Sequence, residues 1–261
     1  MADRLRFEQP QCKPRPDLDQ GRMNMARDDA ALQLWSQFPV DAEPRPLVLT
    51  GLPVRLIGRF RSNHAKLAFH NGAIEAAVEM PPGLFDVMCP VPRRQDGPHR
   101  LQAIGVRQVT AGFETDRGQR EFPAWEVALS DTDGPVLVLD PQVVASAWHP
   151  AGLDVGDGIG HMRHGALHED GYTVTLIFVG IPRAYADYPR VEVLESETAA
   201  MMLPVSVGRE GSESRRLYGE TRQVTATLRQ PLGARVLVTP SGWPVSVVPL
   251  EGAESRLPDG A

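Results

Sequence analysis

Arg107-Gln108-Val109-Thr110-Ala111 recurs without change as Arg222-Gln223-Val224-Thr225-Ala226. The flanking sequence matches as well, because Met88-Cys89-Pro90-Val91 upstream of the first copy corresponds to Met202-Leu203-Pro204-Val205 upstream of the second. Both copies are rich in Val and Thr, which favour strands. The repeat therefore predicts that one β-rich unit occurs twice in tandem.

The composition also favours β structure. The 261 residues include 24 Pro and 24 Gly, which indicates short elements joined by many turns. From Pro46 onward, short apolar runs alternate with turn residues at a spacing typical of a β-sandwich or a small barrel. We therefore predict an all-β fold of two tandem, internally related β-sandwich-like domains with a short N-terminal helix.

The predicted boundaries follow changes in composition along the chain. Residues 1–45 are expected to form an N-terminal arm and the short helix, and residues 46–150 the first β-domain. Gly, Asp and His concentrate in residues 151–171, which we expect to be a connector between domains. The second β-domain is then predicted over residues 172–250, followed by a polar tail over residues 251–261.

The short helix is expected directly before the first β-domain. Asp28 or Asp29 can cap it, apolar side chains from Ala31 to Phe38 form one face, and Pro39 ends it. Apolar stripes of this kind usually face a core. We therefore expect the helix to pack on the first sheet rather than to bind a partner.

Charge and hydropathy exclude several kinds of partner. A formal charge of −6 with scattered arginines gives no basic field, so nucleic acid is not an expected partner. The longest apolar stretch, Tyr172 to Pro182, is too short for a transmembrane segment. The first residues lack the apolar core of a signal peptide, which predicts a cytoplasmic location by default and leaves association with the cell envelope open.

Cys12 and Cys89 are too few for a disulfide framework, and Cys89 is expected to be a core residue.

A segment of the first domain resembles an uncharacterised actinobacterial protein family. The pattern is Thr115-Asp116-Arg117-Gly118, followed by Arg120 and by Pro123-Ala124-Trp125. The resemblance extends over Pro44 to Leu250 and carries no known activity or cofactor. It implies no catalytic residues for this chain.

Three histidines form the main concentration of metal-ligand residue types. His161, His164 and His168 could together hold zinc or another divalent ion and leave a position open for water, as a hydrolytic metal site requires. The surrounding glycines favour a solvated linker instead, because a flexible loop loses entropy when it converges on an ion. A metal-dependent hydrolase or metal-binding protein is therefore the alternative prediction, and otherwise no cofactor is expected.

The remaining observations favour a binding protein over an enzyme. The sequence contains no Gly-x-Ser-x-Gly elbow, no His-Glu-x-x-His pair and no Walker-type loop. Tyr185 and Tyr188 lie in a predicted loop, and Arg117 lies in a predicted hairpin turn, so all three are candidates for a binding surface. We therefore predict a non-catalytic binding or scaffolding protein, with another protein or a second copy of the chain as partner.

Overall fold

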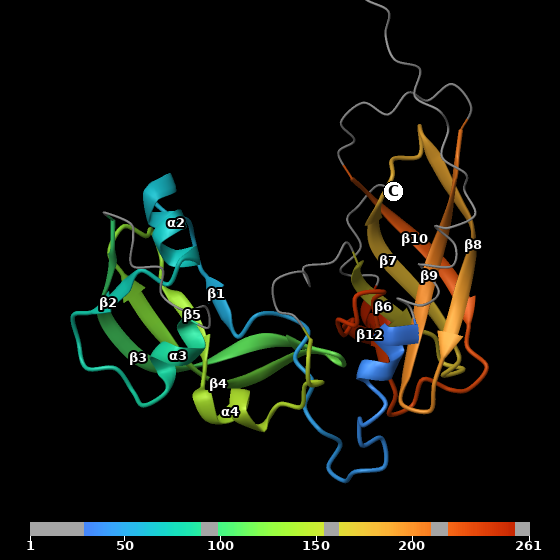
Figure 1. Ribbon diagram of the computed structural model, residues 1–261, viewed down its shortest axis with the longest axis horizontal. Coiled ribbons are helices and arrows are strands. Elements are labelled where there is room, and N and C mark those ends of the chain that lie inside the picture. The colour runs from blue at the N-terminus through green and yellow to red at the C-terminus, as the bar shows by residue number, and fades with distance from the viewer. Residues whose placement is uncertain (1–28, 90–98, 154–161, 210–218, 254–261) are drawn as a thin grey trace, which may run out of the picture.

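The computed structural model describes residues 29–89, 99–153, 162–209 and 219–253 (Figure 1). Strands dominate these residues and the helices are few and short, which confirms the predicted all-β class. The strands form three sheets of five, four and three strands.

The five-stranded sheet is built from the first half of the chain, in the order β1-β5-β4-β3-β2. Its strands are β1 (Val54–Leu56), β2 (Ile74–Ala76), β3 (Leu101–Thr115), β4 (Gly118–Leu129) and β5 (Val136–Leu139). The long strands β3 and β4 form a hairpin that closes where Thr115 pairs with Gly118. Its tight turn is held by the Thr115 hydroxyl, which donates to the Gly118 carbonyl at 2.6 Å. The predicted turn at Thr115–Gly118 is thus confirmed.

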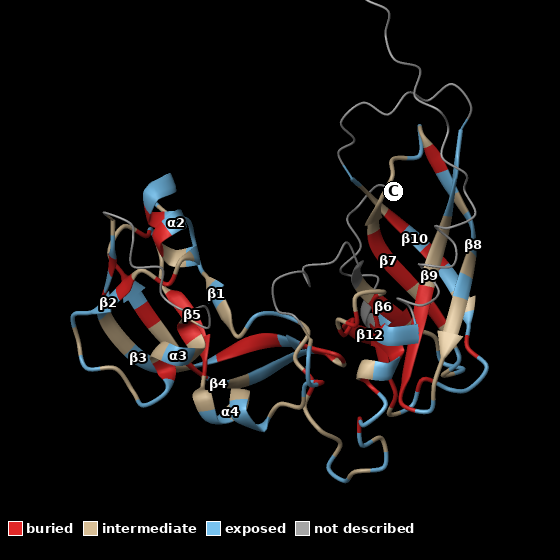
Figure 2. Ribbon diagram, viewed as in Figure 1, coloured by how far each residue is buried: buried red, intermediate tan, exposed pale blue. Residues whose placement is uncertain are grey.

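Both faces of this sheet are covered by apolar side chains. Helices α2 (Asn63–His70) and α3 (Leu84–Met88) contribute to the cluster on one face, together with Leu101, Val127 and Val138. Helix α4 (Pro141–Ser146) contributes Val143 and Val144 to a second cluster around Phe113 and Leu139. Figure 2 shows these buried positions along the strands, while much of α2 is exposed.

The second half of the chain forms the two smaller sheets. The four-stranded sheet has the order β10-β7-β6-β12 and the three-stranded sheet the order β11-β9-β8. Leu176, Met202 and Leu237, which come from both sheets, belong to one hydrophobic cluster. The strands and the final helix have the following bounds: β6 (Met162–Leu167), β7 (Thr173–Gly180), β8 (Ala186–Glu195), β9 (Ala199–Gly208), β10 (Glu220–Thr227), β11 (Val236–Val238), β12 (Val247–Pro249) and α5 (Leu250–Ala253).

The predicted connector over residues 151–171 is shorter than the sequence indicates. Strand β6 begins at Met162 and is paired on both edges, with β7 on one side and β12 on the other. Gly165 has a packing role here, because a Cβ at this position would meet side-chain atoms of Leu237 and Val247 at 3.2 and 3.3 Å. The glycine therefore allows close packing in the sheet, where the composition predicts a flexible joint.

The N-terminal helix packs against the second half of the chain, so the expectation that it covers the first sheet is wrong. Residues 29–34 are helical. The indole of Trp35 is fully buried, and its N–H donates to the Gly242 carbonyl at 2.7 Å. Trp35 shares a cluster with Met201 of β9 and Val238 of β11 and lies 5.0 Å from the ring of Trp148. Figure 1 shows this helix beside β9.

The two copies of the repeated pentapeptide both lie in strands, but the strands have different neighbours. Strand β3 pairs with β4, which follows it, and with β2, whereas β10 pairs with β7, which precedes it. Arg107 of the first copy is exposed, while Arg222 of the second is buried. The strand pairing therefore gives no support to a tandem duplication.

The tip of the β3–β4 hairpin joins the two halves of the molecule. Asp116 is almost fully buried, and its carboxylate accepts hydrogen bonds from both terminal nitrogens of Arg45, at 3.2 Å for the longer one. The Asp116 carbonyl accepts from the N–H of Val247, and its own N–H donates to the Val48 carbonyl, both at 3.0 Å. One residue therefore ties together three segments that are distant in the sequence.

Replacing Arg45 by Met is expected to destabilise the protein strongly. The variant leaves the Asp116 carboxylate without its buried counterion, and loss of one partner of a buried pair costs about 3–5 kcal/mol. Urea unfolding of the full chain measures the change. The control is Arg190→Met, whose ion pair with Glu192 is exposed and should contribute about 1 kcal/mol or less. Equal effects of the two substitutions would contradict the role of the buried pair.

Candidate functional site

The predicted metal ligands are not brought together by the described part of the chain. His161 lies outside the described residues. His164 is on β6, and His168 follows this strand with its N–H donating to Thr173. Four residues of extended chain separate their Cα atoms by about 13 Å. Among the described residues there is no group of three His, Cys, Asp or Glu side chains that could hold a metal ion. The three-histidine site stays a prediction.

The imidazole of His168 has a nearby polar partner on the sheet. Its Nε2 lies 3.0 Å from the hydroxyl of Thr175, which also lies 2.9 Å from the hydroxyl of Thr225. These contacts hold the ring beside β7 and β10. The described geometry of His168 is therefore that of a hydrogen-bonded surface residue.

Two of the three predicted surface residues are engaged inside the molecule. The hydroxyl of Tyr188 accepts from the N–H of Ile181 at 2.9 Å, and its ring packs edge-on against Phe178 at 4.9 Å. The guanidinium of Arg222 lies 5.1 Å from the centre of the same ring. Tyr188 is half-buried, and these contacts satisfy both its hydroxyl and its ring. Tyr188 is thus a packing residue, whereas half-buried Tyr185 stays a candidate contact.

Arg117 likewise serves the contact between the two halves of the chain. One of its terminal nitrogens donates to the carbonyls of Gly233 and Arg235, at 2.6 and 2.7 Å. Burial lowers the pKa of the Arg117 guanidinium, Asp116 raises it, and Arg45 lowers it again. The hairpin turn therefore docks against the segment before β11, and Arg117 as a binding residue stays a prediction.

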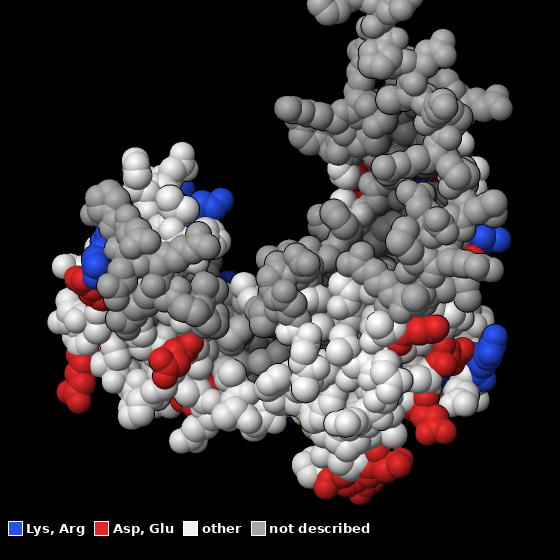
Figure 3. All heavy atoms as spheres, in the orientation of Figure 1, with Lys and Arg blue, Asp and Glu red and all other residues white. Residues whose placement is uncertain are grey.

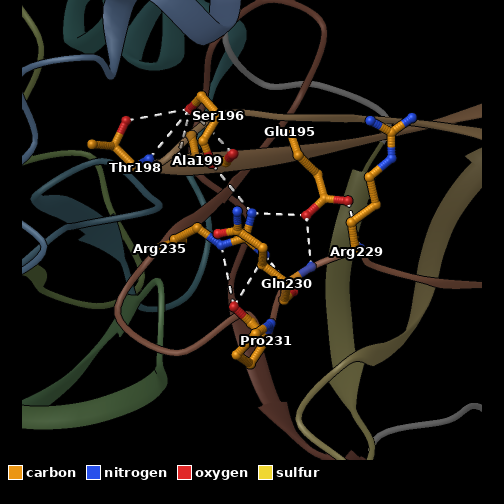
Figure 4. A network of polar contacts seen from close by, with 8 residues as sticks. All are labelled: Glu195, Ser196, Thr198, Ala199, Arg229, Gln230, Pro231 and Arg235. Carbon is orange, nitrogen blue, oxygen red and sulfur yellow. Dashed lines mark hydrogen bonds and ion pairs between the residues drawn. The ribbon is translucent and has the colours of Figure 1, made fainter.

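A buried network of polar and charged side chains lies beside β8, as would be expected of a catalytic or binding site (Figure 4). The Glu195 carboxylate accepts from the side chain of Arg235 at 2.8 Å and from the backbone N–H of Arg229 at 2.7 Å. Arg235 also donates to the carbonyls of Pro231 and Ser196. Burial raises the pKa of Glu195, but the hydrogen bonds from Arg229, Arg235 and Gln230, together with the charge of Arg235, lower it, and the net shift is downward. Because these groups satisfy one another's hydrogen-bonding capacity, the network is a structural connection between loops.

Replacing Glu195 by Gln is expected to destabilise the protein by about 1–3 kcal/mol near neutral pH. Since the folded pKa lies below the unfolded one, the stabilisation is present above the unfolded pKa. It is lost as the pH falls through the folded pKa. Urea unfolding at several pH values should show the two proteins converging in acid. Glu192→Gln, at an exposed position on the same strand, is the control and should show no such convergence.

A further candidate feature is the outer edge of β3, which is only partly covered by β2. Strand β2 pairs only with Leu101 to Ala103, and β4 occupies the other edge. The N–H of Thr50 donates to the carbonyl of Glu114, so the backbone groups of Glu114 point away from β4. Because orientation alternates along a strand, those of Val106, Gln108 and Thr110 point the same way.

This stretch of edge, Val106 to Thr110, has no strand beside it in the described residues; we call it the open edge of β3. Arg107, Gln108 and Thr110 are exposed, and Val106 is half-buried. The Arg107 guanidinium forms a two-point ion pair with Glu126 of β4, at 2.8 and 2.7 Å. The hydrogen bond from Arg107 lowers the pKa of Glu126. The open edge thus carries backbone groups that pair with no described strand, and the charge of Arg107 beside them is already paired with Glu126.

Comparisons with family models, with curated proteins and with solved structures give no match for this chain. Among the described helices, none has the length and apolar character needed to cross a membrane. The site is therefore defined by its geometry, and the open edge of β3 is the candidate binding surface.

Proline substitutions are expected to show whether the backbone N–H of a β3 residue faces β4 or solvent. Val109→Pro removes an N–H that faces β4 and leaves the carbonyl of buried Ala124 without its donor. Thr110→Pro removes an N–H that faces solvent. Val109→Pro should therefore be the less stable variant by about 1–3 kcal/mol in urea unfolding. Equal destabilisation would show that the edge is not open.

Proposed function

We propose that this chain is a non-catalytic binding or scaffolding protein that associates through the open edge of β3. The observation that carries the proposal is the set of outward-facing backbone groups at Val106, Gln108 and Thr110, which pair with no strand among the described residues. Such an edge is a template for an added strand, since main-chain hydrogen bonds provide affinity for any extended segment in register. No group of reactive side chains accompanies it in the described residues, which favours binding over catalysis.

The partner that fits this edge is a second copy of the chain. In the antiparallel register that places Val109 opposite Val109 of the second copy, Gln108 faces Thr110 and Arg107 faces Ala111. No charge then faces a like charge, and Arg107 keeps its own counterion, Glu126. Cross-strand pairs of β-branched residues such as Val109 stabilise antiparallel pairing. A two-fold axis through the edge would make the contact self-complementary, as in most homodimers.

We further propose that the two halves of the chain are separate β-domains, and that the second is sandwich-like. The shared hydrophobic cluster of the two smaller sheets supports this arrangement. The resemblance of Thr115–Trp125 to uncharacterised actinobacterial proteins adds no activity to the proposal. The metal-dependent alternative has no supporting contact among the described residues.

Light scattering of the full chain over a concentration series tests the proposal. The wild-type protein should shift from 28.6 kDa to twice that mass as concentration rises. Thr110→Pro should remain at the single-chain mass, because proline removes a donor and blocks the approach of a strand. Thr110→Ala keeps the backbone N–H and is the matched control, which should associate like the wild type.

A wild-type protein that stays at the single-chain mass throughout would refute self-association through the edge. Association of Thr110→Pro at wild-type strength would also refute it, since the contact would then lie elsewhere. The melting temperature of Thr110→Pro, measured in the same buffer, confirms that loss of association does not result from unfolding.

A further inference from the structure

A second surface, remote from the open edge in sequence and independent of the proposed function, is a hollow between the end of β1 and the start of α2. Its volume is about 650 Å³. Its lining residues are Leu56, Gly58, Arg59, Phe60, Arg61, Ser62, Asn63 and Lys66. Arg59, Arg61 and Lys66 are cationic, and no acidic residue is among them. Figure 3 shows Lys and Arg side chains beside α2 on the face in view. In a chain with a formal charge of −6, this is a local concentration of positive charge.

The two arginines are held side by side by one carboxylate. The Nε–H of Arg59 and the Nε–H of Arg61 each donate to a different oxygen of Asp133, both at 2.9 Å. The hydrogen bonds from Arg61 and Arg59 lower the pKa of Asp133, so this carboxylate stays charged and continues to accept both hydrogen bonds. Because only the Nε groups of these arginines have hydrogen bonds to the described residues, their terminal nitrogens keep donors for a further acceptor.

The backbone that carries these arginines is fixed in place. The Arg61 N–H donates to the carbonyl of Asp131 at 2.9 Å, and the Asp133 N–H donates to the carbonyl of Arg59 at 3.0 Å. Gly134 permits this close approach, because a Cβ at that position would collide with the backbone carbonyl of Ile57. The backbone that carries the arginine pair is thus preorganised, which lowers the entropy lost when an anion binds.

Lys66 adds a third positive charge from the first turns of α2. Among the described residues no acidic side chain forms an ion pair with it. The hydroxyl of Ser62 already accepts the N–H of Ala65 as the helix cap. The hollow is therefore cationic because of its side chains, and the end of the helix is not what defines it.

We propose that this hollow binds the phosphate group of a small phosphorylated ligand. Arginine matches the geometry of phosphate oxygens through two parallel hydrogen bonds, and the lysine adds a point charge. Three cations against the single Asp133 carboxylate suit a doubly charged anion better than a carboxylate. Leu56 and Phe60 provide an apolar wall for the organic part of the ligand.

Isothermal titration of the full-length protein at constant ionic strength tests this site. The probes are inorganic phosphate, phenyl phosphate and benzoate. We expect phenyl phosphate to bind most tightly, inorganic phosphate less tightly and benzoate weakest. Arg61→Gln and Lys66→Gln should each weaken phenyl phosphate binding at least about 10-fold, because each removes a hydrogen bond to a charged group.

The matched control is Arg190→Gln, since Arg190 is as exposed as Arg61 and is also paired with a carboxylate. It should bind phenyl phosphate like the wild type. Lys66→Gln keeps the arginine pair with Asp133 intact, so its effect cannot arise from a loosened turn. The proposal is overturned if the wild type binds neither phosphate probe. It is also overturned if Arg190→Gln weakens binding as much as Arg61→Gln, or if benzoate binds as well as phenyl phosphate.

Discussion

The arrangement of the molecule depends on the buried ion pair between Arg45 and Asp116. A buried carboxylate is tolerated only with a counterion and hydrogen bonds, and Asp116 has both. Because it lies at the tip of the β3–β4 hairpin, this requirement fixes the hairpin against the second half of the chain. It also fixes the segment that leads from the N-terminal helix into β1. A single charged residue thereby defines how three parts of the sequence meet.

The two copies of the repeated pentapeptide place their arginine in opposite surroundings. In β10, Arg222 is buried and donates to the carbonyls of Ile181 and Ala186, so it fastens the strand to the loop before β8. In β3, Arg107 lies in solvent and pairs with Glu126. Local sequence therefore specifies a strand in both places, and the tertiary surroundings decide whether its charged residue is part of the interior or of the surface.

The features that could be predicted from the sequence are those with local causes. Asp116 and Gly118 predict a tight turn because Asp and Gly supply the backbone freedom that a reversal needs, and the all-β class follows from short apolar runs between turns. The apolar stripe ending at Phe38 predicts a buried helix face, but a stripe carries no information about which sheet covers it. The glycines around the three histidines predict a flexible linker, whereas Gly165 serves close packing, because both demands select the same amino acid.

The candidate site itself was only partly accessible to this reasoning. An exposed strand edge could be expected from an all-β chain, but its location depends on how far β2 extends beside β3, which is a tertiary property. The arginine pair at Asp133 was missed because Arg59 and Arg61 meet that carboxylate across a long separation in sequence. The alternation of Arg59, Phe60 and Arg61 before a Ser cap was the available signal.

The burial of Trp35 has a consequence for how the protein is made. Its hydrogen-bond acceptor, Gly242, lies 207 residues further along the chain. At ribosomal speeds of about 5–20 residues per second, the interval between the two is about 10–40 s. During that time Trp35 and Phe38 have no complete docking surface, so the nascent chain carries an uncovered aromatic face until Gly242 has been added. Chaperone capture of the emerging polypeptide would act on this face first.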